Sequence, residues 1–197
     1  KKNPQLIAQP DHDIDRKEIY QKYLPTPDRL EFVPSKDHVF LIINDGSDLA
    51  PAVIRKLQHK GWSKIAVLNF PNTLIPKTLD NLAAAVSFEL TDLSESAIQE
   101  ALKKIKQRLE TIDSAIYLVP QIPVSNSELF KNNLSEQILK HLFFLSKHLQ
   151  PEVTKNRFKD NERHSFTIVT HMDGQLGIGG FQWYDAVQGG YYGLLKT

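Results

Sequence analysis

The sequence predicts an α/β fold, with one domain built on a doubly wound, mostly parallel β-sheet. Short apolar segments alternate five times with segments of helical period, which is the pattern of successive β–α–β units. The clearest apolar segment, Val39–Ile43, has no polar residue, as expected of a strand covered on both faces. A chain of 197 residues that are 41% hydrophobic is long enough to bury one core.

The first strand and the first helix are predicted from local signals. After Val39–Ile43, three apolar residues recur at every fourth position and predict one buried helix face; they are Leu49, Val53 and Leu57. Pro51 must lie in the first turn of this helix, because only there is a missing N–H harmless. Asp48 is then the expected N-cap, with its carboxylate accepting free N–H groups. Gly61 is the expected left-handed residue at the C-terminus, with Trp62 as its apolar partner.

The remaining elements are predicted from the same two patterns, short apolar segments for strands and a helical period for helices. Further strands are expected at Ile65–Phe70, Ala85–Glu89, Ala115–Val119 and Phe166–Thr170. Further helices are expected at Ser94–Thr111 and Leu134–Gln150, with a last helix that begins near Val187.

The two ends of the chain suggest a piece of a larger protein. Residues 1–30 hold four prolines and many charges with little apolar period, so we predict a linker from an upstream domain, with one helical turn at Asp15–Tyr23. The predicted domain then spans residues 31–197. The chain begins without Met and stops inside an apparent helix at Lys196–Thr197, which leads us to expect an excised fragment.

Composition excludes several classes of function. A formal net charge of +1 gives no support to a nucleic-acid or membrane-surface role. The absence of cysteine excludes a disulfide framework, a thiolate nucleophile and a cysteine-based zinc site. No apolar run approaches the roughly 20 residues needed to span a bilayer, and no N-terminal signal pattern is present. We therefore expect a cytoplasmic location and no metal site.

The turn after the first strand is where a dinucleotide-binding fold places its glycines. Such glycines let bare backbone N–H groups approach a pyrophosphate at a helix N-terminus. Here Gly46 is followed by Ser47 and stands between the carboxylates of Asp45 and Asp48. Two like charges about 4 Å apart repel by about 4 kcal/mol at an effective dielectric of about 20. Asp45, Gly46 and Ser47 are cofactor candidates by position, yet we predict that the turn binds no cofactor.

The end of the second strand also departs from a nucleotide site. About 20 residues after the glycine turn, such sites place an acid for the ribose hydroxyls or a base for a 2′-phosphate. This chain has Asn69, followed by Phe70 and Pro71. Asn69 could donate a neutral hydrogen bond to a ribose, but asparagines at strand ends commonly form turns.

The C-terminal residues are the best argument for an enzyme. Tyr192 and Lys196 have the Tyr-x-x-x-Lys spacing of short-chain dehydrogenases. One helical turn apart, the lysine lies on the face of the tyrosine and lowers its pKa, so that the phenol can exchange a proton with a carbonyl substrate. Thr170, at the end of the fifth strand, would be the hydroxyl that holds the substrate oxygen. A single motif of this kind is common by chance, and 22 residues separate Thr170 from Tyr192.

The histidines and the densest basic cluster have simpler explanations. His141 and His148 are seven residues apart on one predicted helix, too far for shared metal ligation. His171 beside Asp173 resembles a general base, although a loop histidine after a strand is the simpler interpretation. The four basic residues of 103–108 are opposed by glutamates before and after them on the same predicted helix, and they indicate a solvated helix face; the glutamates are Glu95, Glu100 and Glu110.

Five longer strings of the sequence, taken together, have the pattern of a known family. They are Phe40–Ser47, Gly61–Trp62, Val67–Pro71, Asp173–Gly177 and Gly189–Thr197. These strings resemble the ketoreductase region of bacterial type I polyketide synthases and polyunsaturated fatty-acid synthases. The resemblance covers about residues 24 to 197.

The resemblance implies that the chain is the first of two halves. In that family the first half is a truncated Rossmann-like, short-chain-dehydrogenase-like subdomain without cofactor, and the second half carries NADPH and the Ser/Tyr/Lys/Asn chemistry. The helix that matches Tyr192–Lys196 usually reads Trp-Gly-Leu-x-Arg there, and it packs rather than reacts. This chain departs from that pattern, because tyrosine and lysine replace the usual tryptophan and arginine and give the catalytic motif Tyr-x-x-x-Lys.

We therefore expect a non-catalytic structural subdomain, inactive alone, of a multidomain polyketide or fatty-acid synthase. Its expected partner is the catalytic ketoreductase subdomain of the same chain, where NADPH would reduce a β-ketoacyl group held by an acyl carrier protein. Separation from that half would leave an apolar patch, so a homodimer is a further expectation. Two alternatives stay open: a short-chain reductase that uses Thr170, Tyr192 and Lys196, and a module that docks a carrier protein.

Overall fold

The computed structural model describes residues 34–76, 85–122, 133–154, 164–171, 190–191 and 194. All of them lie in the unit that spans Phe32–Thr197. The predicted linker, 1–30, lies outside the described residues, as do Tyr192, Lys196 and the loop that holds Asp173.

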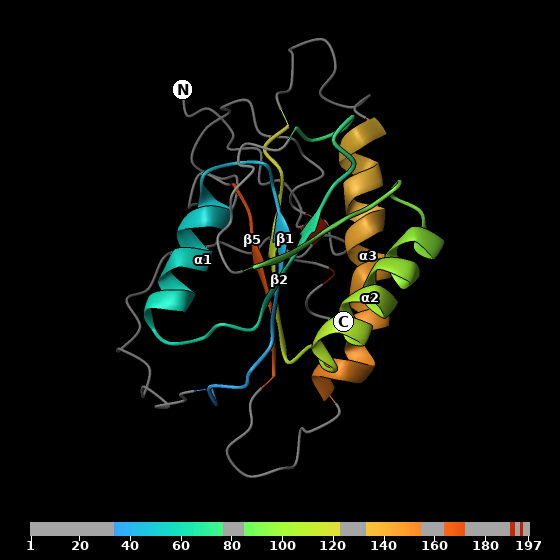
Figure 1. The fold of residues 1–197 in the computed structure, drawn as a ribbon. Coiled ribbons are helices and arrows are strands. Elements are labelled where there is room, and N and C mark those ends of the chain that lie inside the picture. Colours follow the sequence, from blue (N-terminus) through green and yellow to red (C-terminus); the bar gives the residue numbers. More distant parts are fainter. Residues whose placement is uncertain are drawn as a thin grey trace, which may run out of the picture. The chain divides into compact units, whose positions relative to one another are not determined.

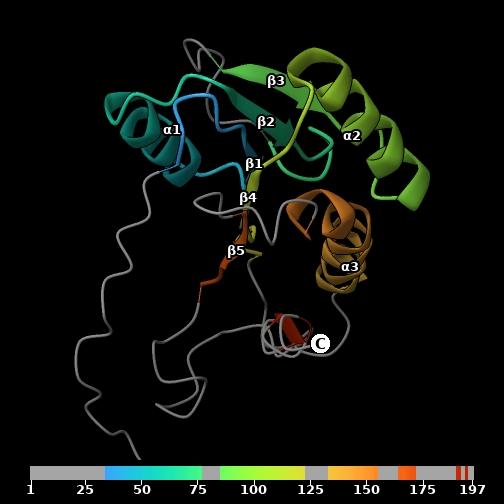
Figure 2. The same cartoon turned by 90° about the horizontal axis from the view of Figure 1, so that it is seen from below.

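The described strands form one parallel sheet (Figures 1 and 2). They are β1 (Phe40–Asn44), β2 (Ile65–Asn69), β3 (Val86–Glu89), β4 (Ser114–Leu118) and β5 (Ser165–Val169). The order across the sheet is β3-β2-β1-β4-β5, and all four pairings are parallel. This is the strand order of a Rossmann fold, so the predicted α/β class and doubly wound sheet are confirmed.

Helices cover both faces of this sheet, as Figure 2 shows. The helix α1 (Leu49–His59) lies on one face, and α2 (Glu95–Leu109) and α3 (Asn133–Thr154) lie on the other. Residues 190, 191 and 194 are also helical, in the region where the last helix is predicted. No helix among the described segments is long and apolar enough to cross a membrane.

The core has two layers, one on each side of the sheet. Alternate residues of β1 enter different layers, because successive side chains of a strand point to opposite faces. Phe40 and Ile42 pack in the smaller layer beneath α1. Leu41 and Ile43 pack in the larger layer beneath α2 and α3. Every residue of β1 is buried, which explains why its sequence shows no polar alternation.

The C-terminus of α1 has the predicted geometry. Gly61 adopts a φ of +95°, in the left-handed region. Its N–H donates to the carbonyl of Gln58 at 2.9 Å, and the N–H of Trp62 donates to the carbonyl of Leu57 at 3.2 Å. These two bonds form a Schellman motif, and Trp62 and Leu57 both pack against the smaller core layer.

The N-terminus of α1 corrects the prediction for Asp48. Asp48 occupies the N-cap position, but its side chain makes no capping hydrogen bond, and the residue is exposed. The N–H of Leu49 instead donates to Oγ of Ser47 at 3.1 Å. Asp48 has a helical backbone conformation, with φ −71° and ψ −4°, whereas a capping side chain needs an extended one. The cap therefore comes from one residue earlier than predicted.

This correction gives a test by paired substitution. Ser47→Ala is expected to lower the free energy of unfolding by about 1 to 2 kcal/mol, because it removes a capping acceptor and a partner of Asp45. Asp48→Ala is expected to cost at most about 0.5 kcal/mol, through its interaction with the helix dipole. Urea unfolding of both variants measures the difference. A larger loss in Asp48→Ala than in Ser47→Ala would contradict this description of the cap.

The end of α3 also differs from its prediction. The pattern places the end at Gln150, since Pro151 cannot donate an N–H to the preceding turn. The helix continues through Pro151 to Thr154. The hydroxyl of Thr154 donates to the carbonyl of Gln150 at 2.7 Å. Proline therefore removes one helical hydrogen bond near the end of a 22-residue helix without ending it.

Candidate functional site

The candidate site lies at the carboxyl edge of the sheet, near β1 and β4. The chain leaves β1 for α1 on one face and leaves β4 for α3 on the other. Such a change of face opens a crevice in which ligands of parallel sheets usually bind. The turn after β1, the end of β2 and the residues after β5 all lie at this edge. The structure thus brings Asp45, Gly46, Ser47, Asn69 and Thr170 to one edge.

Backbone N–H groups of the β1 turn (Asp45–Asp48) donate hydrogen bonds to side chains of the turn and of the residue before it. The N–H of Gly46 donates to Oδ1 of Asn44 at 3.0 Å. The N–H and the hydroxyl of Ser47 both donate to the carboxylate of Asp45, at 3.1 and 2.7 Å. With the bond from Leu49 to Ser47, three backbone N–H groups near the helix N-terminus have intramolecular partners. A bound phosphate would have to break these bonds.

A second segment of the chain lies against this turn. The strap (Pro71–Pro76) follows β2 and is held by hydrogen bonds from the N–H groups of Leu74 and Ile75 to the carbonyl of Pro71, at 2.8 and 3.1 Å. A Cβ placed on Gly46 would lie 2.7 Å from Cγ2 of Ile75 and 2.8 Å from the carbonyl oxygen of Pro76. Gly46 also has a φ of +80°. Glycine is therefore required here by the close approach of the chain itself.

Asn69 is part of a buried polar ladder. Its carbonyl oxygen accepts from the amide of Asn44 at 2.9 Å. Its own amide donates to the hydroxyl of Ser87 at 2.8 Å and to the carbonyl of Phe88 at 3.0 Å. The ladder joins the ends of β1, β2 and β3, and Asn69 is only 4% exposed. Its hydrogen-bonding groups are thus already used, and the suggested ribose contact would require the ladder to break.

Asp45 has a histidine neighbour that sequence analysis missed. Its carboxylate side chain is only 1% exposed, and Nε2 of His171 lies 3.7 Å from its Oδ2. His171 was considered with Asp173, which follows it in the sequence, but the structure places it beside Asp45. The carboxyl ends of β1 and β5 lie at the same edge of a parallel sheet, so the predicted sheet could have indicated that Asp45 and His171 are close. The imidazole and the two Ser47 donors together surround the Asp45 carboxylate.

A buried polar pair lies in the larger core layer. The hydroxyl of Tyr117 on β4 is 2.9 Å from Nδ1 of His141 on α3, and both side chains are fully buried. Burial lowers the pKa of His141 to about 3. Burial, and secondarily the nearby Tyr191, raise the pKa of Tyr117 well above its usual value. Among the described residues, Nε2 of His141 has no hydrogen-bond partner. Both groups are therefore neutral at pH 7. The sequence analysis did not predict that they form a polar pair.

Comparison with known proteins shows the fold class. No family model matches this chain, and no curated protein matches it. Among solved structures, it is similar to 3-ketoacyl-(acyl-carrier-protein) reductase from Brucella melitensis complexed with NADH, with a TM-score of 0.60 and 18% identity over 81% of this chain and 67% of that chain. It is also similar to levodione reductase, with a TM-score of 0.59 and 14% identity over 81% of this chain and 63% of that chain.

A third similar structure is a putative dehydrogenase from Burkholderia cenocepacia with bound NADP, with a TM-score of 0.55 and 20% identity over 78% of this chain and 58% of that chain. The chain spans 58% to 67% of the length of these three structures. At such low identity the similarity shows the fold alone. The fold is a truncated, Rossmann-like form of the short-chain dehydrogenase/reductase fold.

Proposed function

We propose that this chain is a non-catalytic structural subdomain of the ketoreductase of a multidomain polyketide or fatty-acid synthase. It would support NADPH-dependent β-ketoacyl reduction by the half of the region that follows it. The observation that carries this proposal is the contact of the strap with Gly46, where Ile75 and Pro76 occupy the space over the β1 turn. On this proposal, a Rossmann fold whose own chain lies so close to the turn would retain the scaffold and leave no place for the diphosphate.

Hydrogen bonding and charge support the same conclusion. A diphosphate is bound by free N–H groups at a helix N-terminus, and those of Gly46, Ser47 and Leu49 already have partners. Pro51, in the first turn of α1, has no N–H to offer. The buried carboxylate of Asp45 would repel the diphosphate, by about 4 kcal/mol per unit charge at about 4 Å and an effective dielectric of about 20.

The apolar surface beside α3 supports a packing role. A groove of about 550 Å³ is lined mainly by apolar side chains, among them Phe143, Leu149, Val153, Phe166 and Leu194. Phe143 is 50% exposed. Exposed apolar patches of this kind mark surfaces that pack against other protein. The proposed partner is the catalytic half of the same ketoreductase, and the acyl carrier protein and a second copy of this chain are further candidates.

Calorimetric titration with NADPH tests the absence of a cofactor site. The expected result is no saturable heat up to about 1 mM NADPH, which corresponds to a binding free energy weaker than about −4 kcal/mol. The 3-ketoacyl-(acyl-carrier-protein) reductase with NADH in its structure is a suitable positive control. Micromolar binding of NADPH to this chain would contradict the proposal.

An active short-chain reductase is the second candidate, because similar structures contain NADH and NADP. In this case Tyr192 would donate the proton to the substrate carbonyl, Lys196 would lower its pKa, and Thr170 would hold the substrate oxygen. Oxidation of NADPH by a β-keto thioester, lost in Tyr192→Phe, would favour this candidate. The structural proposal predicts no NADPH oxidation in either protein.

A further inference from the structure

Within the described part of the chain, the strand β5 is paired on one side only. Its neighbour is β4, and β5 is the last strand in the order across the sheet. The carbonyl of Val169 accepts from the N–H of Val119 at 2.9 Å, so the backbone groups of Val169 point toward β4. Since these groups alternate in direction along a strand, those of Phe166 and Ile168 point away from β4. We call the outward N–H and C=O groups of Phe166 and Ile168 the β5 edge.

The sequence of β5 is unusual for a strand at the edge of a sheet. Ser-Phe-Thr-Ile-Val contains neither a charge nor a proline, although natural proteins commonly place such residues on edge strands to prevent further pairing. Every residue of β5 is exposed or half-buried, whereas four of the five residues of β4 are buried. Parallel strands are normally covered on both faces. The strand β5 thus has the composition of an inner strand but the exposure of an outer one.

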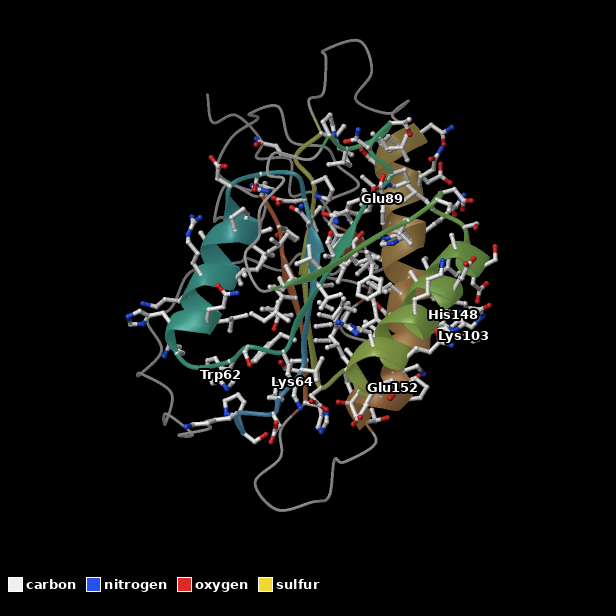
Figure 3. The ribbon with its side chains drawn as sticks, in the orientation of Figure 1. Trp62, Lys64, Glu89, Lys103, His148 and Glu152 are labelled. Atoms are coloured by element: carbon white, nitrogen blue, oxygen red, sulfur yellow. The ribbon has the colours of Figure 1, made fainter. Side chains whose placement is uncertain are left out.

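The strand β3, at the opposite edge of the sheet, differs in three respects (Figure 2). It ends on the exposed Glu89 (Figure 3). The hollow beside it is lined partly by charged side chains, among them Glu89, Glu100 and Lys104, whereas the groove beside β5 is mainly apolar and is lined by Phe166 and Leu194 among others. In the Rossmann order 3-2-1-4-5-6, strand three is terminal, but strand five has a further neighbour.

We propose that the β5 edge binds an added strand with apolar side chains, in the position of strand six. The backbone groups of Phe166 and Ile168 pair with this strand, and the apolar groove receives its alternate side chains. Main-chain hydrogen bonds then supply affinity, and the groove supplies specificity. A helix is a poorer occupant, because it would leave the backbone groups of the β5 edge unpaired. The source of the strand rests on the proposed function: it is the ketoreductase half that follows, whose contact with the groove continues along β5.

Hydrogen exchange of the full chain tests whether the β5 edge is open. The amides of Phe166 and Ile168 are expected to exchange at least about tenfold faster than those of Thr167 and Val169, which point toward β4. Slow exchange of all four amides would overturn the inference, because the edge would then already be covered. That outcome would leave the proposed function standing, since the proposed function depends on the β1 turn.

A synthetic peptide tests the kind of occupant. The probe alternates threonine and valine with a lysine at each end, and nuclear magnetic resonance of the full chain follows its binding. In a parallel strand whose valines face the groove, the threonine amides face β5. N-methylation of the threonines is expected to weaken binding by at least about tenfold, and N-methylation of the valines by less than about twofold. Equal weakening by both, or a greater loss with methylated valines, would overturn the position of strand six.

A pair of proline variants locates the binding edge on the protein. Ile168→Pro removes an outward N–H of β5, and proline is tolerated where the lost N–H faces away from the sheet. Glu89→Pro makes the same change on β3, because the N–H of Leu90 donates to Asn69 and that of Glu89 therefore points outward. Ile168→Pro is expected to weaken peptide binding by at least about tenfold and Glu89→Pro by less than about twofold. Equal weakening would overturn the proposal. Circular dichroism checks that both variants are folded, and the methylated peptides decide if either is not.

Discussion

Replacement of Gly46 by alanine is expected to destabilise the fold by about 2 to 5 kcal/mol. A φ of +80° places residue 46 in the left-handed region, which costs an L-residue about 1 to 2 kcal/mol. The added Cβ would also lie 2.8 Å from the carbonyl oxygen of Pro76. That atom belongs to the backbone and cannot rotate away, so overlap adds about 1 to 3 kcal/mol. Urea unfolding measures the total.

Gly61→Ala is the matched control for this substitution. Gly61 also has a positive φ, of +95°, but no atom of the described segments lies within 4 Å of the position of its Cβ. This variant should therefore lose only the conformational term, about 1 to 2 kcal/mol. The excess loss in Gly46→Ala reports the contact with the strap. Equal losses in the two variants would show that Pro71–Pro76 does not press on the β1 turn.

Acidification is expected to unfold the protein through His141. In the unfolded chain a histidine binds a proton near pH 6.5, whereas burial lowers the pKa of His141 to about 3 in the native state. Below pH 6.5 the unfolded state therefore binds more protons than the native state, so the free energy of unfolding decreases as the pH is lowered. The contribution is complete above about pH 6.5 and is lost progressively towards about pH 3. Between pH 6.5 and pH 4.5 the loss is about 2 to 3 kcal/mol.

The variant His141→Leu isolates this effect. It removes the titrating group, so the part of the pH dependence between about pH 6.5 and pH 4.5 that His141 causes should disappear, even though Tyr117 loses a hydrogen-bond partner. His59→Gln is the control, because His59 is exposed on α1, and it should keep the pH dependence of the unchanged chain. Thermal unfolding across this pH range measures all three proteins. An unchanged pH dependence in His141→Leu would show that His141 is not buried in its neutral form.

Most of the fold could be predicted because its signals are local. The apolar run at Val39–Ile43 and the helical period of Leu49, Val53 and Leu57 lie within single elements, and each was found close to its predicted place. Gly61 was predictable for the same reason, since a Schellman motif depends on adjacent residues. The error at Asp48 had a local cause as well. Ser47 and Asp48 are both good capping residues, and only the backbone angles select one of them.

The contacts at the candidate site are between residues that are distant in the sequence. The single glycine and the two aspartates indicated a poor phosphate turn, but nothing in the sequence placed Ile75 and Pro76 against Gly46. Asn69 was a reasonable ribose candidate until its partners on β1 and β3 were known. His171 was considered only beside Asp173 and was interpreted as a loop histidine, whereas the structure places it beside Asp45, after another strand. Side-chain partners across a sheet depend on register and backbone path, which local patterns do not specify.

Nuclear magnetic resonance of the labelled chain with NADPH tests most directly whether its own residues fill the cofactor position. The amide resonances of Gly46, Ser47 and Leu49 report the three donors, and the methyl resonances of Ile75 report the strap. With millimolar NADPH present, we expect these resonances to stay where they are and the three amides to remain protected from hydrogen exchange. Saturable shifts of these amides at micromolar NADPH, together with displacement of Ile75, would contradict the account.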